Sequence, residues 1–317
     1  MTTRPNELQR TERRALLIGK WSNLFMAFAG VTAALLSRSD AMLVDGLYSL
    51  VNFLSAIAAT RIGARVGAPA TRSRPWGHDF DEALYVTFRS LILIGVLVFA
   101  LILSGIKIFT FFTGGTVPEL VFGPIAVYAV VIVVICVALA INYQIAYRRS
   151  GKRSAILKTE SRAAMIDGAL SLGSGAVLLS LPYLQQTPLA PYVPIGDAVL
   201  VIVLVLLIIW QPLGSFRTTL ADLAGVSAPS KTVSAVARAS RALAREKGFK
   251  FHRAAVLQAG RMHFAGVYID PQRPVEAREI DTFQETLAAR LEDLIGPTRV
   301  EVVMTAKTGP LPPDPRE

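Results

Sequence analysis

The chain has 317 residues, of which 52% are hydrophobic and only 18% are charged, and its mean hydropathy is +0.47. A water-soluble protein of this length would carry a larger charged fraction. The single cysteine, Cys136, excludes a disulfide framework and a cysteine-rich metal site, and three histidines are too few for a metal site built from imidazoles. The net charge of +10 does not indicate nucleic-acid binding, because the basic residues cluster at the ends of apolar segments.

The sequence predicts a charged tail over residues 1–14, followed by a transmembrane domain over residues 15–217. This domain contains six apolar segments, and each approaches or exceeds the roughly 20 residues that a helix needs to cross a bilayer. The predicted segments are residues 15–37, 41–60, 86–113, 120–147, 155–184 and 193–213. We therefore expect an all-α bundle of six transmembrane helices surrounded by lipid.

The orientation of this bundle follows from the distribution of lysine and arginine. Basic residues are concentrated in the N-terminal tail, in the loop between the second and third segments and in the loop between the fourth and fifth. The loops at Gly114–Glu119 and Gln185–Tyr192 contain none. Because basic loops stay on the cytoplasmic side, both termini are predicted to be cytoplasmic. We expect a multi-pass integral protein of a bacterial inner (plasma) membrane.

The composition becomes more polar after Arg217, and residues 226–306 show the periodicity of a small folded domain. Apolar positions predict a helix near residues 233–243, a strand pair around Ala259-Gly260, a second helix that stops at Gly296-Pro297, and a third strand. The order αββαβ predicts a ferredoxin-like α+β cytoplasmic domain. Residues 307–317 are rich in proline and are predicted to be a disordered tail.

Two polar stripes interrupt the apolar segments. Asp45, Tyr48 and Asn52 are spaced i, i+3, i+7 in the second segment, so they share one face of a helix. Glu160 and Asp167 take the first and last positions of the same spacing in the fifth segment. Asn52 and Asp167 each lie nine residues, or about 13 Å, from a basic residue at the segment end, which places both near the middle of the membrane. Polar groups at that depth predict a functional site.

Each of these residues also has a structural interpretation. Asp167 could pair with a neighbouring helix, Asp45 could form hydrogen bonds near the outer interface, and Tyr48 and Asn52 could hydrogen-bond between helices. Glu160 could be an interface charge or part of an entry path.

A further set of polar residues precedes the third segment. His78, Asp79 and Asp81 could gather cations at the cytoplasmic mouth as an entry or secondary site, or they could cap a loop.

Three local patterns resemble the cation diffusion facilitator family. They are the Asp45–Asn52 stretch of the second segment, the Gly77-His78…Glu82 stretch before the third, and the Glu160–Asp167 stretch of the fifth. The resemblance implies six transmembrane helices, a cytoplasmic αββαβ domain, and export of divalent metals in exchange for protons by a homodimer. It also implies a metal site at Tyr48, Asn52, Ala163 and Asp167. Only Asp167 keeps the family's usual residue type there, so a histidine-built zinc site is absent.

We therefore predict a secondary transporter that exports a divalent cation by proton antiport. The predicted ligands are Asp167, Asn52, Tyr48 and Asp45, whose oxygen atoms favour Mn²⁺, Mg²⁺ or Fe²⁺ over Zn²⁺. The sequence does not decide among Mn²⁺, Mg²⁺, Fe²⁺ and Zn²⁺, and no cofactor besides the transported ion is expected. The alternative is a non-transporting regulatory or structural dimer partner. An enzyme is not expected, because the chain has no His-Glu-x-x-His, Gly-x-Ser-x-Gly or Walker motif.

Overall fold

A computed structural model describes residues 5–63, 72, 77–78, 80–149, 155–184, 186–188, 190–260 and 262–307. Most of the predicted C-terminal tail, residues 308–317, lies outside these ranges. The chain divides into two compact units, which are residues 1–60 with 89–213 and residues 61–88 with 214–317.

The described residues contain six helical stretches that are long and apolar enough to cross a membrane, which confirms the prediction of six. The first five are α1 (Pro5–Ser37), α2 (Asp40–Gly63), α3 (Phe80–Phe112), α4 (Phe122–Arg149) and α5 (Ala155–Leu184). The sixth stretch is divided into a 3₁₀ turn, η1 (Ala190–Ile195), and two helices, α6 (Gly196–Ile208) and α7 (Trp210–Leu223). Helix α1 begins at Pro5, so the predicted N-terminal tail is largely helical.

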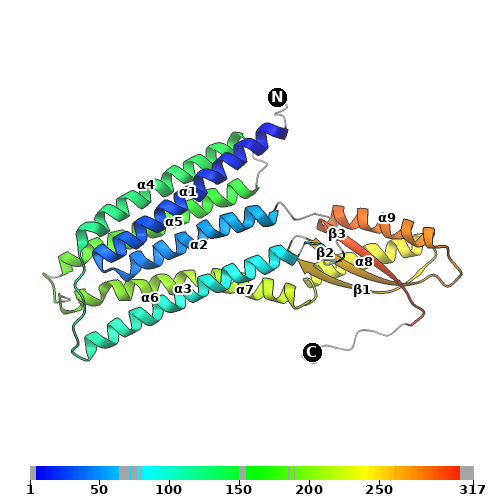
Figure 1. The fold of residues 1–317 in the computed structure, drawn as a ribbon. Helices are drawn as coiled ribbons and strands as arrows, with labels where there is room; N and C mark the ends of the chain where they lie inside the picture. The colour runs from blue at the N-terminus through cyan, green and yellow to red at the C-terminus, as the bar shows by residue number, and fades with distance from the viewer. Residues whose placement is uncertain are drawn as a thin grey trace. The chain divides into compact units, whose positions relative to one another are not determined.

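Helix α4 of the first unit packs against both α1 and α5 (Figure 1). Its buried residues recur every three or four positions, as expected for one face of a helix. They include Ile125, Tyr128, Ile132, Cys136 and Leu139.

Helices α1 and α2 approach each other closely at Gly30 and Gly46. A Cβ atom added to Gly30 would lie 2.5 Å from the Cα atom of Gly46 and 2.9 Å from the hydroxyl oxygen of Tyr128. No side chain fits at that distance, so only glycine permits this crossing. Small residues at helix contacts are the usual means by which membrane helices pack closely.

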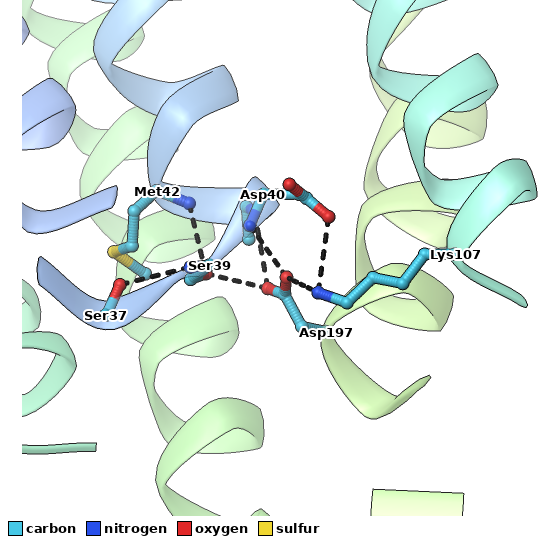
Figure 2. A network of polar contacts seen from close by, with 7 residues as sticks. Ser37, Ser39, Asp40, Met42, Lys107 and Asp197 are labelled. Atoms are coloured by element: carbon cyan, nitrogen blue, oxygen red, sulfur yellow. Dashed lines mark hydrogen bonds and ion pairs between the residues drawn. The ribbon is translucent and has the colours of Figure 1, made fainter. Parts of the chain in front are cut away.

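A buried polar network joins the first residues of α2 to α3 and α6 (Figure 2). Asp197 of α6 is fully buried and accepts hydrogen bonds from the Ser39 hydroxyl (2.7 Å) and from the backbone N–H groups of Asp40 (2.7 Å) and Ala41 (3.3 Å). The ammonium of Lys107 lies 3.3 Å from carboxylate oxygens of both Asp40 and Asp197. The sequence alone did not decide where Asp197 faces.

This network supplies hydrogen-bond acceptors to backbone N–H groups at the start of α2 that would otherwise lack them. The first N–H groups of a helix have no partner within the helix, and they carry partial positive charge. Asp197 accepts hydrogen bonds from two of them on α2, while the hydroxyl of Ser39 accepts one from the N–H of Met42. Lys107 balances the carboxylate charge. The start of α2 is thereby tied to two helices that are distant in sequence.

The second unit contains a three-stranded sheet covered by two helices. Its elements are α8 (Ser230–Glu246), β1 (Lys250–Ala259), β2 (Met262–Asp270), α9 (Ala277–Ile295) and β3 (Thr298–Met304). The strand order is β1-β2-β3, with β1 antiparallel and β3 parallel to β2. This confirms the predicted αββαβ order.

The core of this unit lies between one face of the sheet and the two helices. Alternate residues of β2, Ala265, Val267 and Ile269, are buried against residues of α9 such as Phe283 and Leu287. Gly296 ends α9 with a positive φ of 91°, which glycine adopts without strain.

The first prediction concerns Asp197. Asp197→Asn should destabilise the bundle by about 3 kcal/mol for two reasons. The amide has no charge to balance Lys107. Its NH₂ group is also a hydrogen-bond donor, where the backbone N–H groups need an acceptor. Asp40→Asn is the control and should cost about 1 kcal/mol or less, because Asp40 is partly exposed and its carboxylate meets Lys107 alone among the described residues. The measurement is thermal unfolding in mild detergent, followed by the reaction of a fluorogenic maleimide with the buried Cys136. Equal melting of Asp197→Asn and the wild type would contradict this account.

The second prediction concerns the close helix crossing. Gly30→Val should destabilise the bundle by about 2 kcal/mol, because the added carbons force α1 and α2 apart. Gly95→Val on α3 is the matched control, since a Cβ atom there meets nothing within 4 Å. The same maleimide assay reports both variants. If both lower the melting midpoint equally, the crossing is not the cause.

Candidate metal site

The first unit encloses a cavity of about 310 Å³, which is lined by parts of several helices. Its walls are mostly apolar, and its polar lining includes residues from α2, α4 and α5. They include Asp45, Tyr48, Ser49, Tyr128, Cys136, Asp167, Ser171 and Ser174. The two polar stripes predicted from the sequence therefore meet at one cavity, through Asp45 and Tyr48 of α2 and Asp167 of α5.

Asp45 is held in place by α4. The hydroxyl of Tyr128 donates a hydrogen bond of 2.5 Å to Asp45 Oδ2, and Tyr128 itself is almost fully buried. The absence of a side chain at Gly30 leaves room for this hydroxyl. The second oxygen of the Asp45 carboxylate has no hydrogen bond among the described residues, so it can contact a cation. Asp45 thus has both a fixed position and an available ligand atom.

Asp167 lies on α5 and lines the same cavity. It is close enough to Asp45 for their charges to interact, and among the described residues its carboxylate has no hydrogen bond. Two carboxylates that face one apolar cavity without a cation repel each other, and each is costly to keep charged. This arrangement favours binding of positive charge between them.

Asn52 does not line this cavity, although the sequence groups it with Asp45 and Tyr48. Its side-chain oxygen accepts a hydrogen bond of 3.0 Å from Nη2 of Arg89 on α3. Ala163 of α5, another of the four positions that the resemblance implies, has no side-chain atom that could bind a metal. The cavity therefore lies toward Asp45 relative to the four positions that the resemblance implies.

No three His, Cys, Asp or Glu side chains converge on one point anywhere in the part of the chain that the structure describes. A cation in the cavity would thus need oxygen atoms of other types besides the two carboxylates. Tyr48, Ser49 and Ser171 offer such atoms on the cavity wall.

The predicted entry residues lie elsewhere. His78 Nδ1 is 2.9 Å from Asp81 Oδ2, so these two groups contact each other. Asp79 lies outside the described residues. Glu160 precedes Asp167 by two turns of α5 and does not line the cavity, but its charge interacts with those of Asp167 and Arg89.

Sequence reasoning missed the contribution of α4. Tyr128 and Cys136 are eight residues apart on its buried face, and both line the cavity. Two polarisable groups on one stripe of a highly apolar helix were a usable signal. The stripe could not be assigned to the site without knowing that α4 packs against α5 and α1.

Comparison with known proteins identifies the family of the membrane domain. The model of the cation efflux transmembrane domain matches residues 16–224, which is more than half of the chain. The manganese efflux system protein MneP of Bacillus subtilis (strain 168) is 27% identical over 114 residues, which cover 36% of this chain and 37% of that protein. The aligned part thus spans little more than a third of this relative. The match over the membrane domain, together with the six helices and the C-terminal αββαβ domain, shows that the chain belongs to the cation efflux, or cation diffusion facilitator, family.

Proposed function

We propose that the chain exports a divalent metal cation from the cytoplasm and binds it between Asp45 and Asp167. The observation that carries this proposal is the cavity whose two carboxylates come from different helices. Two carboxylates neutralise the charge of one divalent ion, which is needed where the walls are apolar and water is scarce. Tyr48 and Ser171 supply neutral oxygens at the same cavity.

The ligand types favour manganese. Carboxylate, phenol and hydroxyl oxygens suit Mn²⁺, whereas Zn²⁺ prefers imidazole and thiolate ligands. The three histidines are at positions 78, 252 and 263, outside the six membrane helices. The MneP relative is named as a manganese efflux system protein. Cys136 at the cavity wall adds one softer atom, so selectivity against Zn²⁺ is expected to be incomplete.

Exchange for protons follows from the same two carboxylates. When the metal leaves, both are left facing an apolar cavity, and proton uptake removes their mutual repulsion. Asp167, which has no hydrogen bond among the described residues, is the main candidate for this exchange. The basic loops favour a cytoplasmic position for both termini. The C-terminal αββαβ domain is proposed to join two chains in a homodimer.

A second function has one observation in its favour. Ala163 offers no ligand and Asn52 contacts Arg89, so two of the four family positions do not face a metal. A non-transporting regulatory or structural partner of another family member would have such a site. The two proposals differ in whether this chain moves metal by itself.

The third prediction tests transport in vesicles that contain this protein alone. Wild-type protein should carry Mn²⁺ across the membrane, and Asp45→Asn and Asp167→Asn should each reduce the flux at least about tenfold, because the remaining carboxylate cannot neutralise a divalent ion. The flux is measured with a Mn²⁺-sensitive dye inside the vesicles.

Asp40→Asn is the control for this measurement, because Asp40 is a carboxylate of α2 that does not line the cavity. Flux through Asp167→Asn at the wild-type rate would refute the assignment. Wild-type flux that appears only after a second family member is added would favour the regulatory function.

The fourth prediction concerns orientation. A reporter protein fused after Arg217 should be cytoplasmic, and a tag inserted at Gln186 should be accessible from outside, because the loop that contains Gln186 has no basic residue. Labelling of whole cells with an impermeant reagent measures both. A cytoplasmic tag at Gln186 would contradict the six-span orientation.

A further inference from the structure

A groove of about 680 Å³ runs between α4 and α5 on the surface of the first unit. Large apolar side chains in its lining, such as Ile141, Met165 and Leu172, are exposed, so the groove is open rather than enclosed. These residues belong to two membrane spans, so the surface that they form faces lipid or another protein. The volume is within the range of small-molecule sites, which is enough for part of a lipid molecule.

The groove follows one face of α4. Its lining on this helix extends from Val133 to Arg148 at the i, i+3, i+4, i+7 spacing of residues that share a face. The rise from Val133 to Arg148 is about 22 Å at 1.5 Å per residue. One leaflet supplies about half of a hydrocarbon core of roughly 30 Å. A single acyl chain of one leaflet can therefore lie along the groove.

Small residues bring the two helices together beneath the groove. A Cβ atom added to Gly168 would lie 3.0 Å from the Cβ atom of Cys136. The hydroxyl of Ser161 donates a hydrogen bond of 3.3 Å to the carbonyl oxygen of Ala140. The two backbones approach closely at these points, while the larger lining side chains lie at the surface. This difference in side-chain size explains why a groove forms between the two helices.

The groove ends at a positive charge. Arg148 is the last residue of α4 in its lining and lies at the end of the membrane span Phe122–Arg149. Gln144, one turn earlier, adds an amide to the same lining. Among the residues that the structure describes, Arg148 has no carboxylate partner, and no carboxylate lines the groove. Arginine binds phosphate through its planar set of N–H donors, and basic pockets between membrane helices bind anionic lipid head groups.

We propose that this groove binds an anionic phospholipid of the surrounding bilayer, with one acyl chain between α4 and α5 and the phosphate at Arg148. The apolar length accepts the chain, and the single charge at the membrane interface accepts the head group. A second copy of the protein fits this surface less well. A two-fold contact through the groove would bring two Arg148 side chains together at the same depth, where they would repel each other.

The bound lipid has a consequence for the neighbouring cavity. Cys136 lines both the groove and the cavity that contains Asp167. An acyl chain in the groove would therefore support the contact between α4 and α5 at the wall of that cavity. The inference goes beyond the proposed function, because lipid binding does not require that the protein transports a metal.

The test is lipid binding to the full-length protein in mild detergent, measured by native mass spectrometry. The probes are phosphatidylglycerol and phosphatidylcholine with identical acyl chains. The wild type should bind one phosphatidylglycerol about fivefold more tightly than phosphatidylcholine, because only the former has a net negative charge. Arg148→Gln should remove this preference and leave phosphatidylcholine binding unchanged. Ala169→Trp fills the groove from an exposed lining position and should weaken both lipids at least about tenfold.

Two matched variants are the controls. Arg149→Gln removes the neighbouring exposed charge of α4, which does not line the groove, and should change phosphatidylglycerol binding less than twofold. Val134→Trp adds the same bulk as Ala169→Trp at an exposed position of α4 outside the groove and should leave both lipids unaffected. The maleimide reaction of Cys136 verifies that each variant is folded. If Ala169→Trp does not fold, Arg148→Gln still decides, because Arg148 is exposed.

Equal binding of the two lipids by the wild type would overturn the proposal. Equal losses in Arg148→Gln and Arg149→Gln would also overturn it, because the attraction would then belong to the whole helix end. Unchanged lipid binding by folded Ala169→Trp would show that the chain lies elsewhere. If Ala169→Trp instead converts dimers into monomers in the same spectra and keeps its lipid, the groove is a contact between two copies.

Discussion

Polar and charged side chains inside the helix bundle must satisfy one another, because the hydrocarbon core of a membrane offers them no water. Asp197 shows the fully satisfied case, with two backbone N–H groups, a serine hydroxyl and Lys107 around one carboxylate. Asp167 shows the opposite case, since no described group donates a hydrogen bond to it. A buried carboxylate that has all its partners is an anchor, whereas one that lacks them is available to a cation.

The position of the site depends on how closely the backbones approach. Gly30 and Gly46 allow the backbones of α1 and α2 to come very close where the helices cross. Because Gly30 has no side chain, the hydroxyl of Tyr128 can also lie next to it. That hydroxyl fixes Asp45 at the cavity wall. The glycines thus help to fix the position of Asp45, which is a candidate ligand, and Asp197 holds the start of the same helix. Packing and ligand placement are consequences of one arrangement of α2.

Much of the architecture followed from local patterns. Six apolar stretches, basic loops and the alternating periods of the C-terminal region were sufficient to predict the bundle and the αββαβ domain, because each pattern reflects burial along a single element. The predicted ends of the helices were less accurate. Helix α1 begins at Pro5, because charged residues such as those of the N-terminal tail do not by themselves end a helix. The sixth apolar stretch is interrupted at Ile209, although its composition does not change there.

The sequence by itself determined the type of protein, and it indicated the helices that carry candidate ligands and the candidate acids Asp45 and Asp167, because spacing along a helix decides which residues share a face. Only the tertiary structure decided that Asn52 contacts Arg89, that Tyr128 and Cys136 join the cavity, and that Asp197 is an anchor. Each of these facts concerns a contact between residues on different helices. Such contacts depend on the rotation and depth of every helix in the bundle, which no pattern within one segment contains.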